Sequence, residues 1–411
     1  MRHFDSTSPD FDQALGALLA NRHDPAVDPS VEARVRGILA EVRQEGDEAL
    51  VRWTNELDRA DFTSVASLTV DQAAMDAARE RVGAQVVADL QVAAERIRMF
   101  HRRQREESWS ITTEDGVRLG HRVVPLAAVG VYVPGGTAAY PSSVLMNVIP
   151  ARVAGVERIV MVSPAPGGVI PDGVLAAASV AGVDELYAVG GAQAVGALAF
   201  GTQSIAAVDK IVGPGNIWVA TAKRQVFGTV DIDMIAGPSE LCVVATSNGG
   251  ATPAQLAADL LSQAEHDPLA MVSLVSPDRG LIESVTGEVA RQAAAMPRSA
   301  IAQAAIRDYA ISVLTPDIET ALAVADRIAP EHLELVIVDA DAAAERIRNA
   351  GAIFVGPHTP EAIGDYIAGP NHVLPTNGTA RFSSALGVYD FIKRINVIRF
   401  SRAALETLGP A

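Results

Sequence analysis

Apolar residues in the first hundred positions recur at intervals of three and four, which predicts amphipathic helices. The pattern covers residues 10–19, 31–53 and 71–102. Between the first two runs, Asp28, Pro29 and Ser30 combine a helix stop with a new N-terminal cap. We therefore expect a helix-rich beginning, with a separate helical segment over residues 1–24.

The pattern changes near residue 129, where short runs of β-branched residues begin to alternate with alanine-rich segments. Up to about residue 240, it predicts strands over 158–162, 185–189 and 210–212, and helices over 171–181, 192–200 and 217–227. Residues 241–380 repeat the alternation, with strands over 241–245, 271–275, 333–338 and 353–356, and helices over 253–266 and 316–328. Strand–helix–strand units of this length form parallel sheets. The fold class predicted is α/β, with two Rossmann-like parallel-sheet lobes.

The same change of pattern suggests how the chain divides. We expect one lobe to combine residues 25–129 with 240–385, and the other to span residues 130–239. The last stretch, 386–411, carries apolar side chains such as Val397, Ile398 and Phe400, which need a partner surface. We interpret it as a C-terminal arm.

Composition narrows the classes of function. The 411 residues include 33 basic and 49 acidic side chains, a net charge of −16, which argues against a nucleic-acid surface or a basic membrane anchor. No apolar run is long enough to span a membrane, and the first residues lack the apolar core of a secretion signal. The single cysteine, Cys242, forms no intrachain disulfide and is expected to be buried. We expect a cytoplasmic protein.

Two of the eight histidines lie in short polar segments beside other groups that can bind metal or transfer protons. Gln263 and His266 are three residues apart, so on a helix they share a face and offer an oxygen and a nitrogen ligand. Taken alone, this spacing is also typical of a solvated helix end. Glu331 and His332 adjoin at the start of a predicted strand, where they form either an acid–base pair or a surface ion pair. Asp365 and His372 lie in a later segment bounded by glycine and proline.

Three glycine-rich turns follow predicted strands, at residues 131–136, 189–193 and 212–216. Parallel sheets bind ligands at the carboxyl ends of their strands, and glycine lets the backbone approach a phosphate or ribose. None of the turns fits the G-x-G-x-x-G dinucleotide motif, so a nucleotide crevice and simple tight turns both remain open. Ser239, in a fourth turn, is free to meet a ligand but lacks the spacing of a serine nucleophile.

Taken in order, these motifs resemble the histidinol dehydrogenase family over about residues 5–411. The resemblance includes Val-Gly-Pro-Gly-Asn at 212–216, Gln-Ala-Glu-His-Asp at 263–267, Pro-Glu-His-Leu at 330–333 and Gly-Asp-Tyr at 364–366. Further matching runs are 131–136, 140–147, 189–194, 233–240, 371–376 and 381–384.

The resemblance implies a zinc-dependent, four-electron oxidation of L-histidinol to L-histidine through the aldehyde, with two NAD⁺ used in turn. It implies Glu331 and His332 as the acid–base pair, and a homodimer with one zinc ion per subunit. The residues implied as zinc ligands are Gln263, His266 and Asp365; those that contact NAD are Tyr132, Gln193 and Asn216; and those near the substrate are Ser239, Gln263, His266, His332, Asp365 and His372. The lobe of residues 130–239 is thus expected to bind NAD, and the other lobe to carry the metal and acid–base residues.

Members of this family continue past position 411 with a helix that bears a further zinc ligand and a substrate-binding glutamate. For a chain ending at Ala411 we expect weaker zinc binding and slower turnover. Two alternatives follow: a related zinc- and NAD-dependent dehydrogenase acting on another small polyol such as sulfopropanediol, and a catalytically impaired dimeric scaffold. The presence of Gln263, His266, Glu331, His332 and Asp365 together speaks against the scaffold.

Overall fold

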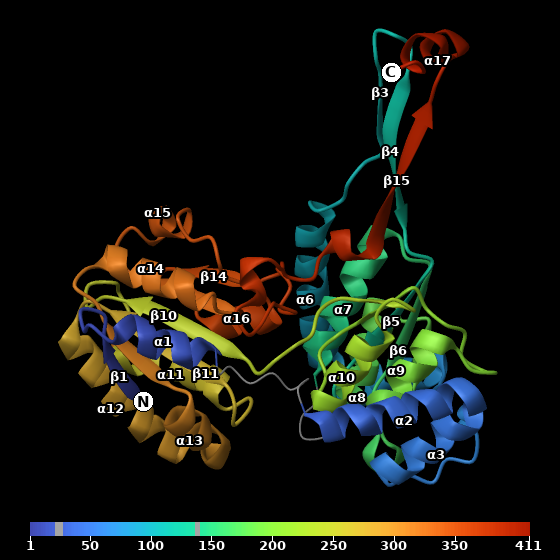
Figure 1. Ribbon diagram of the computed structural model, residues 1–411. Coiled ribbons are helices and arrows are strands. Elements are labelled where there is room, and N and C mark those ends of the chain that lie inside the picture. The colour runs from blue at the N-terminus through green and yellow to red at the C-terminus, as the bar shows by residue number, and fades with distance from the viewer. Residues whose placement is uncertain (21–27, 136–139) are drawn as a thin grey trace. The chain divides into compact units, whose positions relative to one another are not determined.

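The computed structural model describes residues 1–20, 28–135 and 140–411 (Figure 1). Gly136 of the first glycine-rich turn and residues 21–24 of the expected N-terminal helical segment lie outside the described residues. The chain forms two compact units, which we call the first unit (residues 1–28 and 234–385) and the second unit (residues 29–233 and 386–411). Each contains a largely parallel sheet with helices on its faces, so the predicted α/β class is confirmed.

The first unit is built on a six-stranded, wholly parallel sheet in the order β1-β12-β11-β10-β13-β14. Its strands are β1 (Arg2–Asp5), β10 (Glu240–Ala245), β11 (Met271–Ser276), β12 (Ile311–Leu314), β13 (His332–Val336) and β14 (Ala352–Val355). Its helices are α1 (Phe11–Ala20), α11 (Pro253–Ala264), α12 (Arg279–Ala295), α13 (Ser299–Asp308), α14 (Ile318–Ile328), α15 (Ala340–Ala344), α16 (Glu361–Tyr366) and the short 3₁₀ helix η3 (Thr379–Arg381).

Successive residues of β10 point into different cores, because side chains alternate across a strand. Leu241 and Val243 pack with α11 and α12 on one face of the sheet. Cys242 and Val244 pack with α1 and α14 on the other face, so the expected burial of Cys242 is confirmed. The expected N-terminal helical segment begins with a strand, because residues 2–5 pair with β12 at the sheet edge.

The second unit contains a sheet in the order β2-β7-β6-β5-β8-β9, parallel except for β2. Its strands are β2 (Thr69–Val70), β5 (Ala128–Tyr132), β6 (Arg158–Val162), β7 (Glu185–Tyr187), β8 (Lys210–Val212) and β9 (Asp231–Ile232). Its helices are α2 (Pro29–Glu45), α3 (Asp47–Asp58), α4 (Val65–Leu68), α5 (Gln72–Val82), α6 (Ala84–Arg102), α7 (Pro141–Ala154), η2 (Pro166–Gly168), α8 (Asp172–Ala181), α9 (Gly191–Phe200) and α10 (Ile217–Val226).

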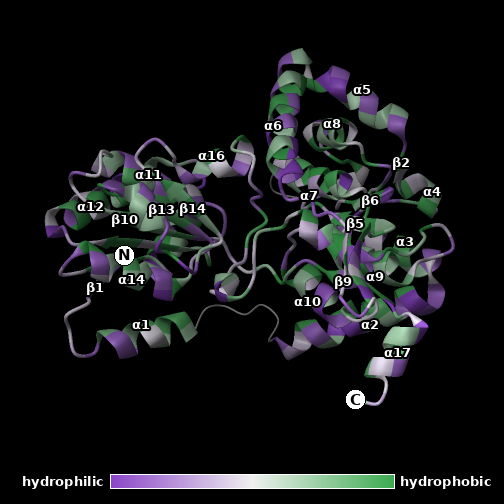
Figure 2. Cartoon of the chain, turned by 90° about the horizontal axis from the view of Figure 1, so that it is seen from above, coloured by the Kyte–Doolittle hydropathy of each residue, from purple (hydrophilic) through white to green (hydrophobic). Residues whose placement is uncertain are grey.

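The grouping of residues 25–129 differs from the one expected. These residues were expected to join 240–385, but residues 29–129 belong to the second unit. The cause is the apolar stripe of α2, whose residues Val35, Leu39 and Val42 are buried in one core with α9 and β8. Helices α5 and α6 likewise pack against α7 and α8, and Figure 2 shows hydrophilic and hydrophobic patches alternating along both.

Two of the long predicted helices are each divided in two by a glycine. Gly46 separates α2 from α3 with φ of 63°, and Gly83 separates α5 from α6 with φ of 87°. Glycine adopts such positive φ values without the steric cost that other residues meet. A helical spacing of apolar residues continues across both breaks, which is why the sequence pattern predicted single helices.

The C-terminal stretch joins a small antiparallel sheet in the order β15-β4-β3. The elements are β3 (Trp109–Thr112), β4 (Arg118–Pro125), η4 (Val388–Phe391), β15 (Ile392–Arg399) and α17 (Arg402–Leu408). Figure 1 shows this sheet extending from the rest of the second unit, with α17 at its tip. Among the described residues, no helix has the length and apolar character needed to cross a membrane.

Candidate active site

The backbone of Glu240 holds both members of the predicted acid–base pair. Its N–H donates to Glu331 Oε2 at 2.9 Å, and its carbonyl oxygen lies 3.0 Å from His332 Nδ1. This follows from the sheet register, in which Leu241 of β10 is paired with His332, the first residue of β13. The pair therefore lies at the amino ends of these strands, not at the carboxyl ends where parallel sheets usually bind ligands.

The contact with Glu240 also fixes the tautomer of His332. A carbonyl oxygen only accepts hydrogen bonds, so Nδ1 of the neutral ring carries the proton and donates it. The other nitrogen, Nε2, then has a lone pair that can accept a proton. This is the arrangement that a general base requires.

Burial moves the pKa values of the two neighbours in opposite directions, because it disfavours the charged form of each. Burial raises the pKa of Glu331 well above its usual range, and the nearby carboxylates of Glu240, Asp365 and Glu361 raise it further. The pKa of His332 is lowered, mainly by burial, with Glu361 partly opposing the shift. At neutral pH the site therefore favours a neutral imidazole beside a carboxyl group that binds protons strongly.

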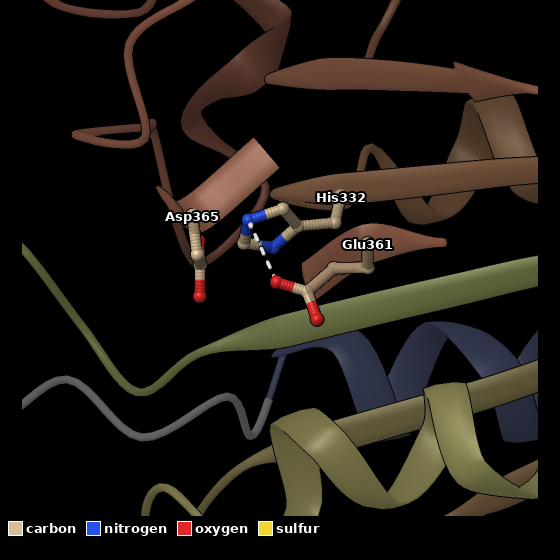
Figure 3. A group of neighbouring side chains, drawn as sticks. All are labelled: His332, Glu361 and Asp365. Carbon is tan, nitrogen blue, oxygen red and sulfur yellow. Dashed lines mark ion pairs between the residues drawn. The ribbon is translucent and has the colours of Figure 1, made fainter. Parts of the chain in front are cut away.

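Figure 3 shows His332 with Glu361 and Asp365, two residues of the short helix α16. One ligand atom from each lies within 4.8 Å of the other two, a grouping that can hold a metal ion. Glu361 Oε1 is 3.8 Å from His332 Nε2, while its Oε2 accepts a hydrogen bond of 2.6 Å from the Ser262 hydroxyl.

Glu361 was not predicted as a site residue from the sequence. The signal was available, because Glu361 precedes Asp365 by four residues and side chains at that spacing share one face of a helix. It was overlooked because a six-residue helix carries too little periodicity to be predicted between glycines and prolines.

The other two predicted metal residues, Gln263 and His266, lie in and just beyond the last turn of α11. Gln263 is in the last turn of α11, 1% exposed, and its Oε1 has no hydrogen-bond partner among the described residues. The helix ends at Ala264, so His266 lies just beyond it and is exposed. The charge of His266 acts on both His332 and His372, lowering the pKa of each. His266 is thus near them without belonging to the trio of Figure 3.

His372 and Ser239 complete the set of predicted substrate residues. Burial lowers the pKa of His372 to about 4, and its Nε2 is a buried atom with no hydrogen-bond partner among the described residues. Ser239 is partly buried and directly precedes β10 and the backbone of Glu240. Both belong to the first unit, as do the acid–base and metal candidates.

The available donors suit zinc. Gln263 and Glu361 each have a buried oxygen without a hydrogen-bond partner among the described residues. These oxygens, the carboxylate of Asp365 and the imidazole of His266 are the kinds of ligand that zinc accepts. Two ligands of one zinc ion lie at most about 4.4 Å apart, because each bond is about 2.0–2.2 Å. Glu361 Oε1 and His332 Nε2, 3.8 Å apart, already satisfy this limit, and every pair of ligand atoms in the trio lies within 4.8 Å.

In the second unit, the predicted nucleotide contacts lie at the carboxyl ends of the strands. The strand order β7-β6-β5-β8-β9 places the first strand of the series, β5, beside the fourth, β8, so the winding reverses between them. Ligands of open α/β sheets bind at such a reversal. Tyr132 ends β5, and Asn216 follows β8 as the N-cap of α10, its Oδ1 accepting from the N–H groups of Trp218 and Val219.

Gln193 lies in the first turn of α9, at the end of β7, and its buried Oε1 has no hydrogen-bond partner among the described residues. The Tyr132 hydroxyl accepts a hydrogen bond of 3.1 Å from the Gly191 N–H at the start of the same helix. Two of the predicted contacts, Tyr132 and Gln193, therefore meet at one helix terminus.

The chain is similar to known proteins both in sequence and in structure. A sequence profile of histidinol dehydrogenase matches residues 21–411. The histidinol dehydrogenases of Geobacter sulfurreducens and Syntrophotalea carbinolica are 51% and 53% identical over 409 residues, covering all of this chain and 94% of each relative. The crystal structure of histidinol dehydrogenase from Elizabethkingia anophelis matches with a TM-score of 0.92 and 34% identity, over 100% of this chain and 93% of that one. The chain therefore belongs to the histidinol dehydrogenase family and is an oxidoreductase.

Proposed function

We propose that this enzyme oxidises L-histidinol to L-histidine through the aldehyde, with zinc bound in the first unit and NAD⁺ bound in the second. The reaction class follows from the family. The observation that carries the residue-level proposal is the position of His332, whose Nδ1 is committed to the Glu240 carbonyl while Nε2 faces Glu361 and Asp365.

His332 acts first in this proposal. Its neutral ring accepts the proton of the substrate hydroxyl at Nε2 as the alcohol carbon is oxidised. The nearby carboxylate of Glu361 stabilises the imidazolium that forms, because opposite charges at this distance attract strongly in a buried site. Proton transfer by a positioned base contributes about 10²–10⁴ in rate.

Glu331 acts in the second oxidation. Its raised proton affinity makes the ionised form a stronger base than an exposed carboxylate, which suits removal of a proton from the water that adds to the aldehyde. The N–H of Glu240 holds its Oε2, so the side chain is oriented before the substrate arrives. Ser239 and His372 are proposed to contact the substrate beside this pair.

Gln263, His266 and Asp365 are proposed to hold zinc, which when bound supplies a Lewis acid that orients the substrate. Tyr132, Gln193 and Asn216 are proposed to contact NAD⁺, which when bound accepts the hydride of each oxidation. Glu361 lies close enough to Asp365 to act as a further ligand. A homodimer in the cytoplasm is part of the same proposal.

The test is histidinol-dependent formation of NADH by the zinc-loaded protein, compared with the variant His332→Asn. We expect two NADH per histidinol for the original enzyme, and a fall in kcat of about 10²-fold or more for His332→Asn with zinc content unchanged. His358→Asn, which replaces an exposed histidine of the same unit, is the control. Near-full turnover by His332→Asn, or no NADH from histidinol with the original enzyme, would refute the proposal.

A further inference from the structure

The glycine turn between β8 and α10 is held by two opposite charges. The Gly213 N–H donates to Asp233 Oδ2 at 2.7 Å, and the Gly213 carbonyl accepts from Lys223 Nζ at 2.9 Å. Lys223 and Asp233 also form an ion pair with each other. The N–H and the carbonyl oxygen of Gly213 are thus each hydrogen-bonded to a side chain, and these two side chains are also paired with each other.

The ion pair is deeply buried, with side-chain exposures of 3% for Lys223 and 1% for Asp233. Burying two charges costs desolvation energy that their attraction often only balances, so such a pair is weak evidence for added stability. Its contacts indicate a different role. Lys223 comes from α10 and Asp233 follows β9, so the pair joins both elements to the turn that follows β8.

The turn in question adjoins the predicted nucleotide contacts. Gly213 has φ of 107°, and a Cβ placed there would lie 2.1 Å from the carbonyl oxygen of Tyr132, so the two backbones touch. Three residues later, Asn216 caps α10. A shift of Gly213 would therefore move the backbone beside Tyr132 and the side chain of Asn216 together.

We propose that Lys223 and Asp233 are positioning residues that hold the turn of residues 213–216 in the conformation that binds the dinucleotide. The inference rests on the proposed use of NAD⁺ by this unit. Lys223 does not act by contacting a phosphate, because its Nζ is buried and already bonded to Gly213 and Asp233.

The experiment compares two buried lysines of neighbouring elements. Lys223→Met removes the charge at the turn. Lys210→Met removes a lysine at the amino end of β8, which is 7% exposed in its side chain and pairs with Asp231 at 3.0 Å. Binding of NAD⁺ is measured by titration calorimetry, with zinc content and melting temperature recorded for each variant.

We expect Lys223→Met to weaken NAD⁺ binding by about 10- to 100-fold, because small displacements of binding groups have effects of this size. Its zinc content is expected to stay unchanged, because the zinc residues lie in the first unit. We expect Lys210→Met to bind NAD⁺ as the original enzyme does, even if its melting temperature falls.

The outcomes separate this inference from the proposed function. Failure of the original enzyme to bind NAD⁺ removes both. Normal binding by Lys223→Met, or equal losses in the two lysine variants, overturns the positioning role alone. Should Lys223→Met not fold, Asp233→Asn replaces it, since it removes the charge but keeps an oxygen for the Gly213 N–H. Weaker NAD⁺ binding by Asp233→Asn supports the role, and affinity equal to the original enzyme overturns it.

Discussion

Glu331 and His332 adjoin in the sequence, contact the same peptide residue and are buried to a similar degree, yet burial gives them opposite proton affinities. The shifts are opposite because Glu331 is charged when it has lost its proton, whereas His332 is charged when it has gained one. Burial therefore makes the carboxyl hold its proton and the imidazole release it. Two adjacent buried side chains thus differ in their proton-binding state, a carboxyl that retains its proton beside an imidazole that is neutral and able to accept one.

Replacing Glu331 by glutamine tests the proposal that His332 acts in the first oxidation and Glu331 in the second. Glu331→Gln keeps the size of the side chain and an oxygen for the Glu240 N–H, but it cannot accept a proton. We expect the oxidation of the aldehyde to slow by about 10²–10⁴-fold, and the oxidation of histidinol to slow much less. Rapid-mixing measurement of NADH from each substrate gives the two rates. Glu283→Gln, at an exposed position, is the control, and equal slowing of both steps would contradict the assignment.

The pKa of Asp365 predicts how zinc binding depends on pH. Burial, together with nearby Glu361, raises it to about 8 in the metal-free protein. A raised folded-state pKa gives stability that is present at low pH and lost as pH rises through about 8. The metal-free protein should therefore lose stability between about pH 6 and pH 8.5, while zinc, which needs the ionised carboxylate, binds more tightly over that range.

The measurement is the rise in melting temperature on adding zinc to chelator-treated protein, at about pH 6 and about pH 8.5. We expect a larger rise at the higher pH, and a much weaker pH dependence in Asp365→Asn. A zinc-induced rise that is equal at both pH values in the original enzyme would show that Asp365 is not a ligand that must lose a proton.

Most residues of this neighbourhood were named from the sequence. Glu331, His332 and Asp365 were named from their motifs, and the structure brings all three into one neighbourhood. The contacts of Glu240 could not be predicted, because they use its backbone, which carries no residue-specific signal. The roles of the acid–base, zinc, nucleotide and substrate residues remain predictions.

Among the elements, α16 is the one whose placement the site depends on most, since both Glu361 and Asp365 lie on it. Pro360 precedes the helix and offers no side-chain cap. The first N–H of α16, at Glu361, instead donates to Glu334 Oε1 of β13 at 2.6 Å. The buried Glu334, on strand β13, thus accepts the hydrogen bond that the side chain of an N-cap residue usually accepts at the start of a helix.

Substitution of Glu334 tests whether this contact places α16. In Glu334→Leu the Glu361 N–H loses its acceptor, a loss that costs about 1–3 kcal/mol for a buried donor, and we expect α16 to shift. Zinc affinity should then fall by about 10-fold or more. Glu334→Gln retains an acceptor oxygen and is expected to bind zinc nearly as the original enzyme does. Equal zinc affinity in the two variants, measured by competition with a chelator, would exclude the capping role.

Element boundaries were predicted correctly where the sequence carries strong local signals. Thr252, Pro253 and Gln255 form a capping box with proline at the first position, and α11 begins at the predicted residue. The helix ends two residues before the predicted end, because no residue at Glu265 or His266 marks a helix stop in the sequence. The breaks at Gly46 and Gly83 were missed because a glycine inside an apolar period does not by itself indicate a positive φ.

For the whole molecule, the two large, mainly parallel sheets were predictable from the alternation of strands and helices, whereas the third, antiparallel sheet of β15, β4 and β3 was not predicted. The assignment of residues 29–129 to a unit was not. An apolar stripe on α2 shows that the helix is covered, but the identity of the covering elements, here α9 and α10, is decided by packing between distant segments. The C-terminal stretch likewise returns to the second unit by pairing β15 with β4.

The small sheet of β3, β4 and β15 carries an exposed apolar row on one face. The register aligns Ile111, Leu119 and Ile398 in one row, and Trp109 lies on the same face. Trp109, Ile111 and Ile398 are 53%, 55% and 67% exposed. The other face is mixed: it carries Ser110, Thr112, Arg118, Arg122 and Arg399 together with Ile395 and Val397, which are 37% and 43% exposed. An exposed apolar row on a sheet is typical of a protein–protein contact, which supports the proposed homodimer.

Ile111→Asp places a charge in the apolar row without touching either unit's core, since Ile111 is exposed. If a second copy of the chain covers this row, burying an unpaired carboxylate there is strongly unfavourable, and the variant should be largely monomeric at micromolar concentration. Thr112→Asp puts the same charge on the opposite face of the same strand and should remain dimeric.

Light scattering coupled to size-exclusion chromatography measures both masses, and circular dichroism checks that the fold is kept. A dimer that persists in Ile111→Asp, or an original enzyme that is already monomeric, would mean that this face has another use. Because Thr112 is the exposed neighbour of Ile111 on the opposite face of β3, a difference between the two variants can be assigned to the face that carries the apolar row.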